Sequence, residues 1–323
     1  MRWYLDVDDA TTGGLAGWIL PDGRLVVGGG QGSPPSIRTL SGDVLYQVPP
    51  ADQIDPGYHH EALLSPEGLA RVAARAGDVG LDGVGFEGFR IEAWDPRSDT
   101  LAWSFASQPQ VDRGLLVPTP GDDDPFHANA VVFADDVDGP AVWVSLRGLG
   151  TLMRIDRDSA EVTGFFGPDR GVALQLPDGT AAADTEWFWG QHAPQIQGDL
   201  VTVYDNGGRR PGGLRYSRIA RYRQLAPDRA ELVWDWTEPG WYETNFGSVI
   251  DVPDTDGHVL VGTGHCGSCP PAGDASWIAE VDPATGSVVW RFDFVDDAYS
   301  VYRAQPLSGC GLFANRRYCP GIL

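Results

Sequence analysis

Three histidines stand at matching places in three successive segments of the chain. His60, His127 and His192 each come just before an apolar stretch of strand length. A neutral imidazole can act as a nucleophile or as a general acid or base. Arg147 follows a further apolar stretch, and a guanidinium donates paired hydrogen bonds to the oxygens of a sulfate or phosphate group. These residue types therefore predict a pocket for a tetrahedral oxyanion, such as a sulfuryl or phosphoryl group.

These side chains can meet only if the strands that carry them converge. The chain consists of short apolar stretches interrupted by Gly, Pro, Asp and Asn, which is typical of β-strands joined by turns. A unit of two strand pairs recurs about every 45–70 residues, and this repeat is typical of a β-propeller. The second pair of each unit falls at residues 36–48, 90–105, 152–166, 219–236 and 278–292.

We expect an all-β chain in which residues 1–323 form a single β-propeller domain with six blades. Residues 302–317 supply inner strands of the sixth blade, and the N-terminal strand at residues 2–7 completes it. Closing the last blade with both chain ends removes exposed sheet edges. Residues 67–76 are the best candidate for a helix, a short one. The innermost strands then bring the histidines to one face of the central channel.

Composition excludes several kinds of partner. The chain has 45 acidic residues against 23 basic ones, and its net charge is −22. Such a charge argues against nucleic acid and anionic membranes as partners. No apolar run reaches the roughly 20 residues that a membrane-spanning helix needs. An anionic substrate would therefore need a local group of Arg or His side chains.

The four cysteines lie late in the chain, in Gly-rich segments, and favour disulfides and export. They are Cys266, Cys269, Cys310 and Cys319, for which three pairings stay open. The C-x-x-C pair could instead be a redox or metal pair, although nothing completes a metal site. We expect no metal and no cofactor. The N-terminus lacks the basic start and apolar stretch of a signal peptide, so a cytoplasmic location is the alternative to export.

At its polar motifs the chain resembles the bacterial aryl-sulfate sulfotransferases (arylsulfotransferases), which are six-bladed β-propellers. The resemblance covers residues 55–305. Its motifs are the histidine pair 59–60, D-x-F-H-x-N at 124–129, S-x-R at 145–147, FWGQH at 188–192, YDNG at 204–207, YSR at 216–218 and YRA at 302–304. The family moves a sulfuryl group from a phenolic sulfate ester to a phenol through a sulfated histidine, without a nucleotide sulfate.

The resemblance implies a role for each matching residue. The catalytic residues would be His192 as the nucleophile, with His60, His127 and Arg147. The substrate-binding residues would be Asn129, Tyr302, His59 and Arg218. His60 would exchange a proton with the phenol, and Arg218 has a structural role in its blade as the alternative. A periplasmic or extracellular location and a homodimer are further implications.

The sequence also departs from the family pattern, and other functions stay open. Glu61 stands where the family commonly has aspartate, Leu146 stands in the middle of S-x-R, and Pro194 closely follows His192. One alternative is a non-enzymatic propeller that binds a peptide or a glycan. Another is a quinoprotein-like dehydrogenase, which shares the Trp-rich repeat but needs a calcium-bound quinone. The channel histidines favour the sulfotransferase.

Overall fold

The computed structural model describes residues 17–28, 34–49, 57–80, 83–264, 276–294 and 302–306. Of residues 57–60 and 74–77 it describes the backbone alone. The contacts divide the chain into two compact units. The first comprises residues 1–76, 89–106 and 305–323, and the second comprises residues 77–88 and 107–304.

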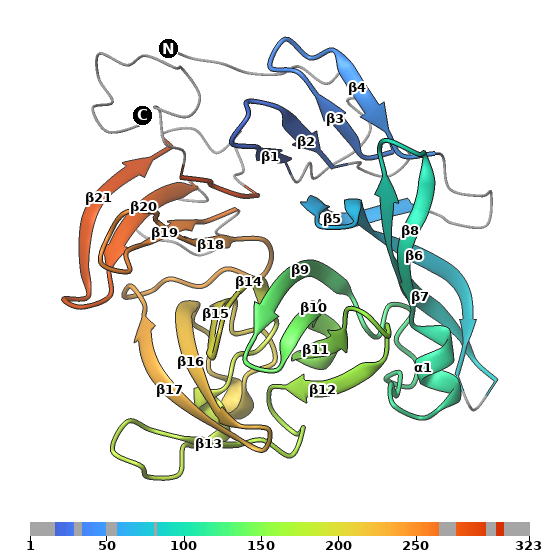
Figure 1. The fold of residues 1–323 in the computed structure, drawn as a ribbon. Helices are drawn as coiled ribbons and strands as arrows, with labels where there is room; N and C mark the ends of the chain where they lie inside the picture. The colour runs from blue at the N-terminus through green and yellow to red at the C-terminus, as the bar shows by residue number, and fades with distance from the viewer. Residues whose placement is uncertain are drawn as a thin grey trace, which may run out of the picture. The chain divides into compact units, whose positions relative to one another are not determined.

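The first unit holds most of two four-stranded sheets whose strands follow chain order (Figure 1). One sheet consists of β1 (Gly17–Ile19), β2 (Leu25–Val27), β3 (Ser36–Arg38) and β4 (Val44–Gln47). The other consists of β5 (Gly57–Ser65), β6 (Gly68–Val79), β7 (Gly85–Asp95) and β8 (Thr100–Ala106). In each of them, two hairpins lie side by side, as expected for a propeller blade.

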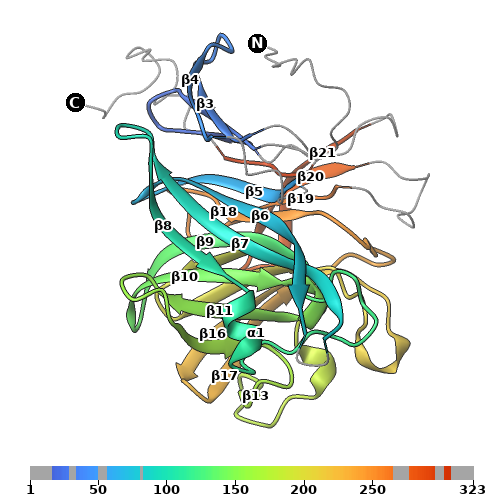
Figure 2. The ribbon, with the colours of Figure 1, turned by 90° about the vertical axis from the view of Figure 1, so that its right-hand side faces the viewer.

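The second unit holds three further sheets. The first consists of β9 (Ala128–Asp136), β10 (Gly139–Leu146), β11 (Thr151–Asp156) and β12 (Val162–Phe166), and Figure 2 shows β9, β10 and β11 in this order. The second consists of β14 (His192–Gln197), β15 (Leu200–Asp205), β16 (Arg218–Ala226) and β17 (Arg229–Trp236), to which β13 (Ala173–Gln175) adds in parallel. The third consists of β18 (Ser248–Asp251), β19 (Val259–Gly262), β20 (Trp277–Asp282) and β21 (Ser287–Asp293).

Helices are few and short in the described part of the chain. They are the α-helix α1 (Gln108–Asp112) and the 3₁₀ turns η1 (Arg147–Leu149), η2 (Asp184–Glu186) and η3 (Pro211–Gly213). Within the described ranges, none of the helices has the length and apolar character that a membrane span requires.

The sheets confirm the predicted all-β propeller, and the described ranges hold five blades instead of the predicted six. The prediction of six treated the two chain ends as one further blade. Residues 302–306 form no strand, whereas residues 2–7 and 307–317 lie outside the described residues. The four cysteines also lie outside them, so their disulfides stay a prediction.

The predicted helix at residues 67–76 was wrong, because residues 68–76 belong to β6 and Glu67 lies in the turn before it. Leu69 and Ala70 are fully buried in the sheet, where β6 pairs with β5. A Cβ on Gly68 would lie 2.1 Å from the carbonyl oxygen of Trp94. Tertiary packing of the strand therefore outweighs the helix propensity of the Ala-rich sequence.

The core of the second unit lies between neighbouring blades. Trp143 of β10 packs in one cluster with Val201 and Val203 of β15, and with Phe166 and Tyr222. All five side chains are nearly or fully buried. Burying a large apolar side chain stabilises the fold by about 1.5–3 kcal/mol. This packing fixes the two neighbouring blades against each other.

The first strands of three blades lie side by side in the second unit. β14 contacts β9 on one side and β18 on the other (Figure 1). Irregular backbone marks the start of each strand, because His127, Ala193 and Phe246 all have positive φ, at 43°, 44° and 64°. Non-glycine residues rarely adopt this conformation, and it is found mostly where function requires a particular placement.

β-Bulges occur at the starts of β5, β9 and β14, where the predicted site residues stand. The register of β9 shifts at Asn129, and the register of β14 shifts over Ala193 and Pro194, directly after His192. A bulge redirects side chains, and it also tolerates a proline, which has no N–H to offer the neighbouring strand. In β5 the shift spans His59 and His60.

Candidate active site

His192 is held in a defined orientation at the start of β14. Its side chain is buried, and Nδ1 lies 2.7 Å from Oδ1 of Asn206. The Asn206 amide nitrogen donates to the carbonyl oxygens of Glu243, at 3.2 Å, and Phe246, at 3.0 Å. These two bonds fix the amide so that its oxygen faces the ring. The Asn206 oxygen can only accept, so Nδ1 carries the proton and Nε2 keeps its lone pair.

Burial keeps this imidazole neutral. Burial is the largest of the effects that together lower the pKa of His192 from 6.5 to about 3, and the hydrogen bond to Asn206 opposes it. Arg147 and His127 lie near enough to contribute to the lowering. At neutral pH the ring is therefore an unprotonated nitrogen nucleophile.

Arg147 extends from η1, directly after β10. Its backbone N–H donates to the carbonyl oxygen of His127 at 3.1 Å, which ties the two motifs together. Its Nη2 donates to the carbonyl oxygen of Thr244 at 3.0 Å and to Oδ1 of Asn245 at 2.9 Å. Its Nε–H is buried and has no hydrogen-bond partner within the described part of the chain. This donor is therefore available to a ligand.

Asp124 positions His127. The Asp124 carboxylate accepts hydrogen bonds from the His127 backbone N–H, at 3.0 Å, and from its ring Nδ1. A carboxylate accepts, so Nδ1 carries the proton and Nε2 points away from Asp124. The D-x-F-H spacing thus provides a histidine and the acidic group that orients it.

Asn129 and Ser145 connect the first blade of the second unit to the backbone beside the nucleophile. The amide nitrogen of Asn129 donates to the carbonyl oxygen of Gln191 at 2.8 Å. The Gln191 amide nitrogen donates to Ser145 Oγ at 3.1 Å and to the Thr151 carbonyl oxygen at 3.0 Å. The serine of S-x-R therefore holds the glutamine of G-Q-H.

Three buried polar atoms of this region have no hydrogen-bond partner among the described residues. They are Oδ1 of Asn129, Oε1 of Gln191 and Nε of Arg147. Burying an unsatisfied polar group costs about 1–3 kcal/mol, and such groups are rare in folded proteins. The Nε–H of Arg147 is a donor that an anionic ligand can satisfy, whereas the two amide oxygens are acceptors and need a donor.

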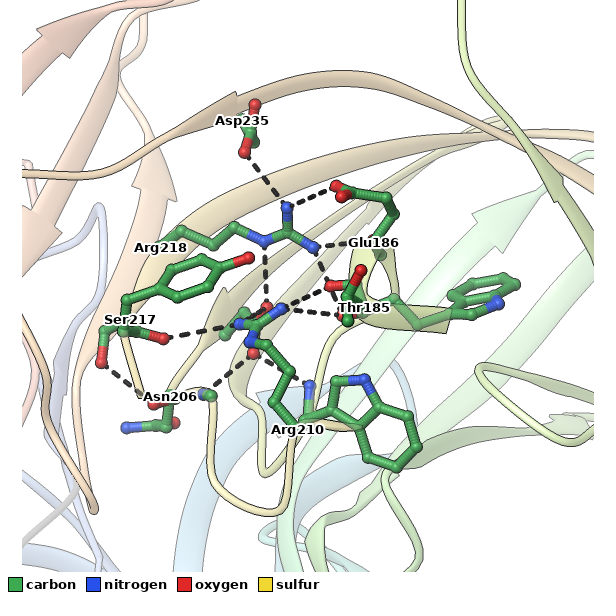
Figure 3. A network of polar contacts seen from close by, with 12 residues as sticks. Thr185, Glu186, Asn206, Arg210, Ser217, Arg218 and Asp235 are labelled. Atoms are coloured by element: carbon green, nitrogen blue, oxygen red, sulfur yellow. Dashed lines mark hydrogen bonds and ion pairs between the residues drawn. The ribbon is translucent and has the colours of Figure 1, made fainter. Parts of the chain in front are cut away.

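The YDNG turn beside the nucleophile is held by a second, purely internal network (Figure 3). Asp205 accepts from Arg210 at 2.6 Å and from Arg218 at 3.1 Å, and all three side chains are almost fully buried. Arg218 also contacts Glu186 at 3.2 Å and Asp235 at 3.1 Å. Carboxylates of the protein itself therefore bind its guanidinium. These contacts favour the structural role in the blade, which was the alternative to substrate binding for Arg218.

Aromatic side chains line the same region. The rings of Tyr302 and Phe246 meet edge to face, with their centroids 5.4 Å apart. Tyr242 lies close enough to Arg147 to affect its pKa. Tyr302 thus packs beside Phe246, whose carbonyl oxygen holds Asn206. This position is compatible with the predicted contact to an aromatic substrate.

His59 and His60 cannot be compared with these residues. They belong to the other unit, and only their backbone, in β5, is described. Their predicted roles stay predictions. In the described ranges there is no group of three or more His, Cys, Asp or Glu side chains that could hold a metal ion.

A scan against protein-family models matches residues 94–303 to "Arylsulfotransferase (ASST)". The match covers most of the chain. The chain belongs to the arylsulfotransferase family. Of the residues that the resemblance named in the second unit, Asn129 bonds the backbone next to His192, and Arg147 and His127 lie near enough to affect the pKa of His192. Their catalytic and binding roles stay predictions. A search of curated proteins finds no significant match for this chain.

A search of solved structures finds chains that are similar to this one at low sequence identity. Hydrazine synthase from Kuenenia stuttgartiensis is 15% identical, with a TM-score of 0.42, and the match covers 87% of this chain and 66% of that chain. The Cps50 (Swd1) β-propeller domain from Myceliophteria thermophila is 11% identical, with a TM-score of 0.44, and the match covers 87% and 86%.

Sequence reasoning missed the residues that orient the arylsulfotransferase motifs. The YDNG motif indicates a turn at Asn206, although Asn in such a sequence can bond either its own turn or a neighbour. Gln191 belongs to the FWGQH motif, but the motif does not show its hydrogen bond to Ser145. Nothing in the spacing shows that Asn206 reaches the imidazole, because 14 residues separate the two side chains.

Proposed function

We propose that this protein is an aryl-sulfate sulfotransferase that works by a two-step displacement. The observation that carries the proposal is the geometry at His192. A neutral ring, with its proton held on Nδ1 by Asn206, lies near enough to Arg147 for the guanidinium to affect its pKa. The Nε–H of Arg147 is buried and has no partner among the residues that the structure describes. A nucleophile with an adjacent oxyanion donor is what sulfuryl transfer requires.

In the first step, Nε2 of His192 attacks the sulfur of the phenolic sulfate ester. The N–S bond forms as the S–O bond to the ring breaks, and the electron pair of that bond leaves with the phenolate. Arg147 and the amide nitrogen of Asn129 donate hydrogen bonds to the sulfuryl oxygens. Asn206 stabilises the positive charge that develops on the ring by accepting from Nδ1–H.

In the second step, the oxygen of an acceptor phenol attacks the same sulfur. The N–S bond breaks, and its electron pair returns to Nε2 of His192. The phenol proton must be taken by a base, and His60 is the residue proposed for it by resemblance. His127, oriented by Asp124, faces the sulfuryl oxygens with Nε2. Donor and acceptor are thus small aromatic molecules, and export, as in the resembling family, is part of the proposal.

The proposal is tested with 4-nitrophenyl sulfate as donor and phenol as acceptor. Nitrophenolate release should depend on phenol, show ping-pong kinetics and disappear in His192→Ala. His258→Ala is the matched control, because His258 pairs with Glu280 at 2.7 Å in another part of the unit. This control should retain wild-type activity. Absence of release with every phenol tried, or faster release from 4-nitrophenyl phosphate, would contradict the proposal.

A further inference from the structure

A second guanidinium, that of Arg209, lies at the edge of the candidate site. Its Nη1 donates to the carbonyl oxygen of Gly148 at 2.9 Å, and Gly148 directly follows Arg147. Burial lowers the pKa of Arg147, and the nearby positive charge of Arg209 lowers it further. Two like charges therefore stand close together in a chain whose net charge is −22.

The backbone of Arg209 is strained. Arg209 has a φ of +67°, in the left-handed region that non-glycine residues avoid. Its side chain is 67% exposed, so burial in the core does not compensate for the strain. Strain of this kind costs about 1–3 kcal/mol and is typical of ligand-binding segments. The strained turn aims the guanidinium across to Gly148.

The charge of Arg209 is only loosely neutralised. Its Nη2 lies 3.8 Å from a carboxylate oxygen of Asp122, beyond hydrogen-bond distance, and both side chains are open to solvent. The next residue, Arg210, contrasts with it, because Arg210 contacts Asp205 at 2.6 Å in a fully buried pair. Because exposed ion pairs of this kind contribute little stability, a carboxylate that binds Arg209 more closely can replace Asp122 as its partner.

We propose that Arg209 binds a carboxylate carried on the aromatic ring of the sulfate donor. This inference rests on the proposed function and specifies its substrate class as carboxylated phenolic sulfates. With the sulfuryl group on Arg147 and His192, a ring carboxylate meets Arg209, whose planar fork matches it. The carboxylate also separates two guanidinium groups that otherwise repel each other. A sulfate donor whose ring carries no carboxylate makes no contact with Arg209, and the guanidinium then stays exposed to solvent.

The test compares two chromogenic donors that differ in one group. They are 4-nitrophenyl sulfate and 2-nitro-5-(sulfooxy)benzoate, which carries a ring carboxylate, each with phenol as acceptor. The measured quantity is the ratio of kcat/KM for the carboxylated donor to kcat/KM for the uncharged donor. Arg209→Gln should lower this ratio about 10-fold to 100-fold, the effect of losing a charge-assisted hydrogen bond. Asp122→Asn should raise it, since the competing carboxylate is gone.

Two further variants separate local binding from general charge. Arg223→Gln removes the same charge from a side chain that is 44% exposed and pairs with Asp199, and it should leave the ratio at its wild-type value. Arg209→Lys keeps the charge without the fork and should give an intermediate ratio. High salt should lower the wild-type ratio, because exposed charge pairs are screened.

Each outcome is decisive. A ratio unchanged in Arg209→Gln, with transfer intact, would overturn the inference and leave the proposed function standing. A ratio that falls equally in Arg223→Gln would also overturn it, since net charge would then explain the effect. Absence of transfer from both donors in the wild type would overturn the proposed function, and the inference with it.

Discussion

Acid should destabilise this protein more steeply than a variant that lacks the His192 imidazole. The side chain is 3% exposed, and burial lowers its pKa from 6.5 to about 3. Below pH 6.5 the unfolded chain binds a proton at this residue and the folded chain does not. Stability is therefore lost as the pH falls from 6.5 toward 3, by about 1.4 kcal/mol per pH unit. At pH 5 the loss from this residue is about 2 kcal/mol.

Urea unfolding of the wild type and of His192→Gln, at pH 7 and at pH 5, measures the part of this stability loss that is due to His192. Glutamine keeps a polar side chain near Asn206 but does not titrate. The free energy of unfolding should fall between the two pH values by about 2 kcal/mol more in the wild type than in the variant. Parallel losses in the two proteins would refute the reasoning, because the imidazole would then ionise as freely in the folded state as in the unfolded one.

Three further predictions test the site and its support. Arg147→Gln should lower kcat by about 10²–10³-fold, as expected for one oxyanion donor, in single-turnover assays. Asn206→Asp should raise the pKa of the nucleophile by placing a negative charge at Nδ1, so its pH–rate profile should gain an acid limb that the wild type lacks. Gly247→Ala should unfold more readily than Gly257→Ala, because its Cβ would lie 2.3 Å from the Tyr204 ring, whereas Gly257 has open space and a similar positive φ; equal urea midpoints would contradict this.

The strand repeat could be predicted from the sequence because turns and alternating strands are local features. Each predicted strand pair that lies in the described residues is a hairpin of the structure, such as β11 and β12 from residues 152–166. The helix at 67–76 was mispredicted because burial against neighbouring strands decides that segment. The parallel strand β13 has no signal, since three residues carry too little pattern.

The sequence could predict a site residue only where a reactive or charged side chain also stands at the end of a predicted strand. His127, Arg147 and His192 stand at strand ends, and a propeller brings such ends together. Arg218 looked similar but points to Asp205, Glu186 and Asp235, which sequence spacing does not reveal. The bulge that accommodates Pro194 also depends on the register of β14 against β15. The sequence therefore could not show which residues, far apart in the chain, become hydrogen-bond, ion-pair or strand partners in the fold.

The central claim is that His192 carries the sulfuryl group between donor and acceptor. The most direct measurement is mass spectrometry of the protein after addition of 4-nitrophenyl sulfate alone, followed by peptide mapping under basic conditions that preserve N–S bonds. The account predicts the added mass of one sulfuryl group on the peptide that contains His192, and its loss when phenol is added. An unmodified His192 peptide during active turnover, or the group on another residue, would contradict the account.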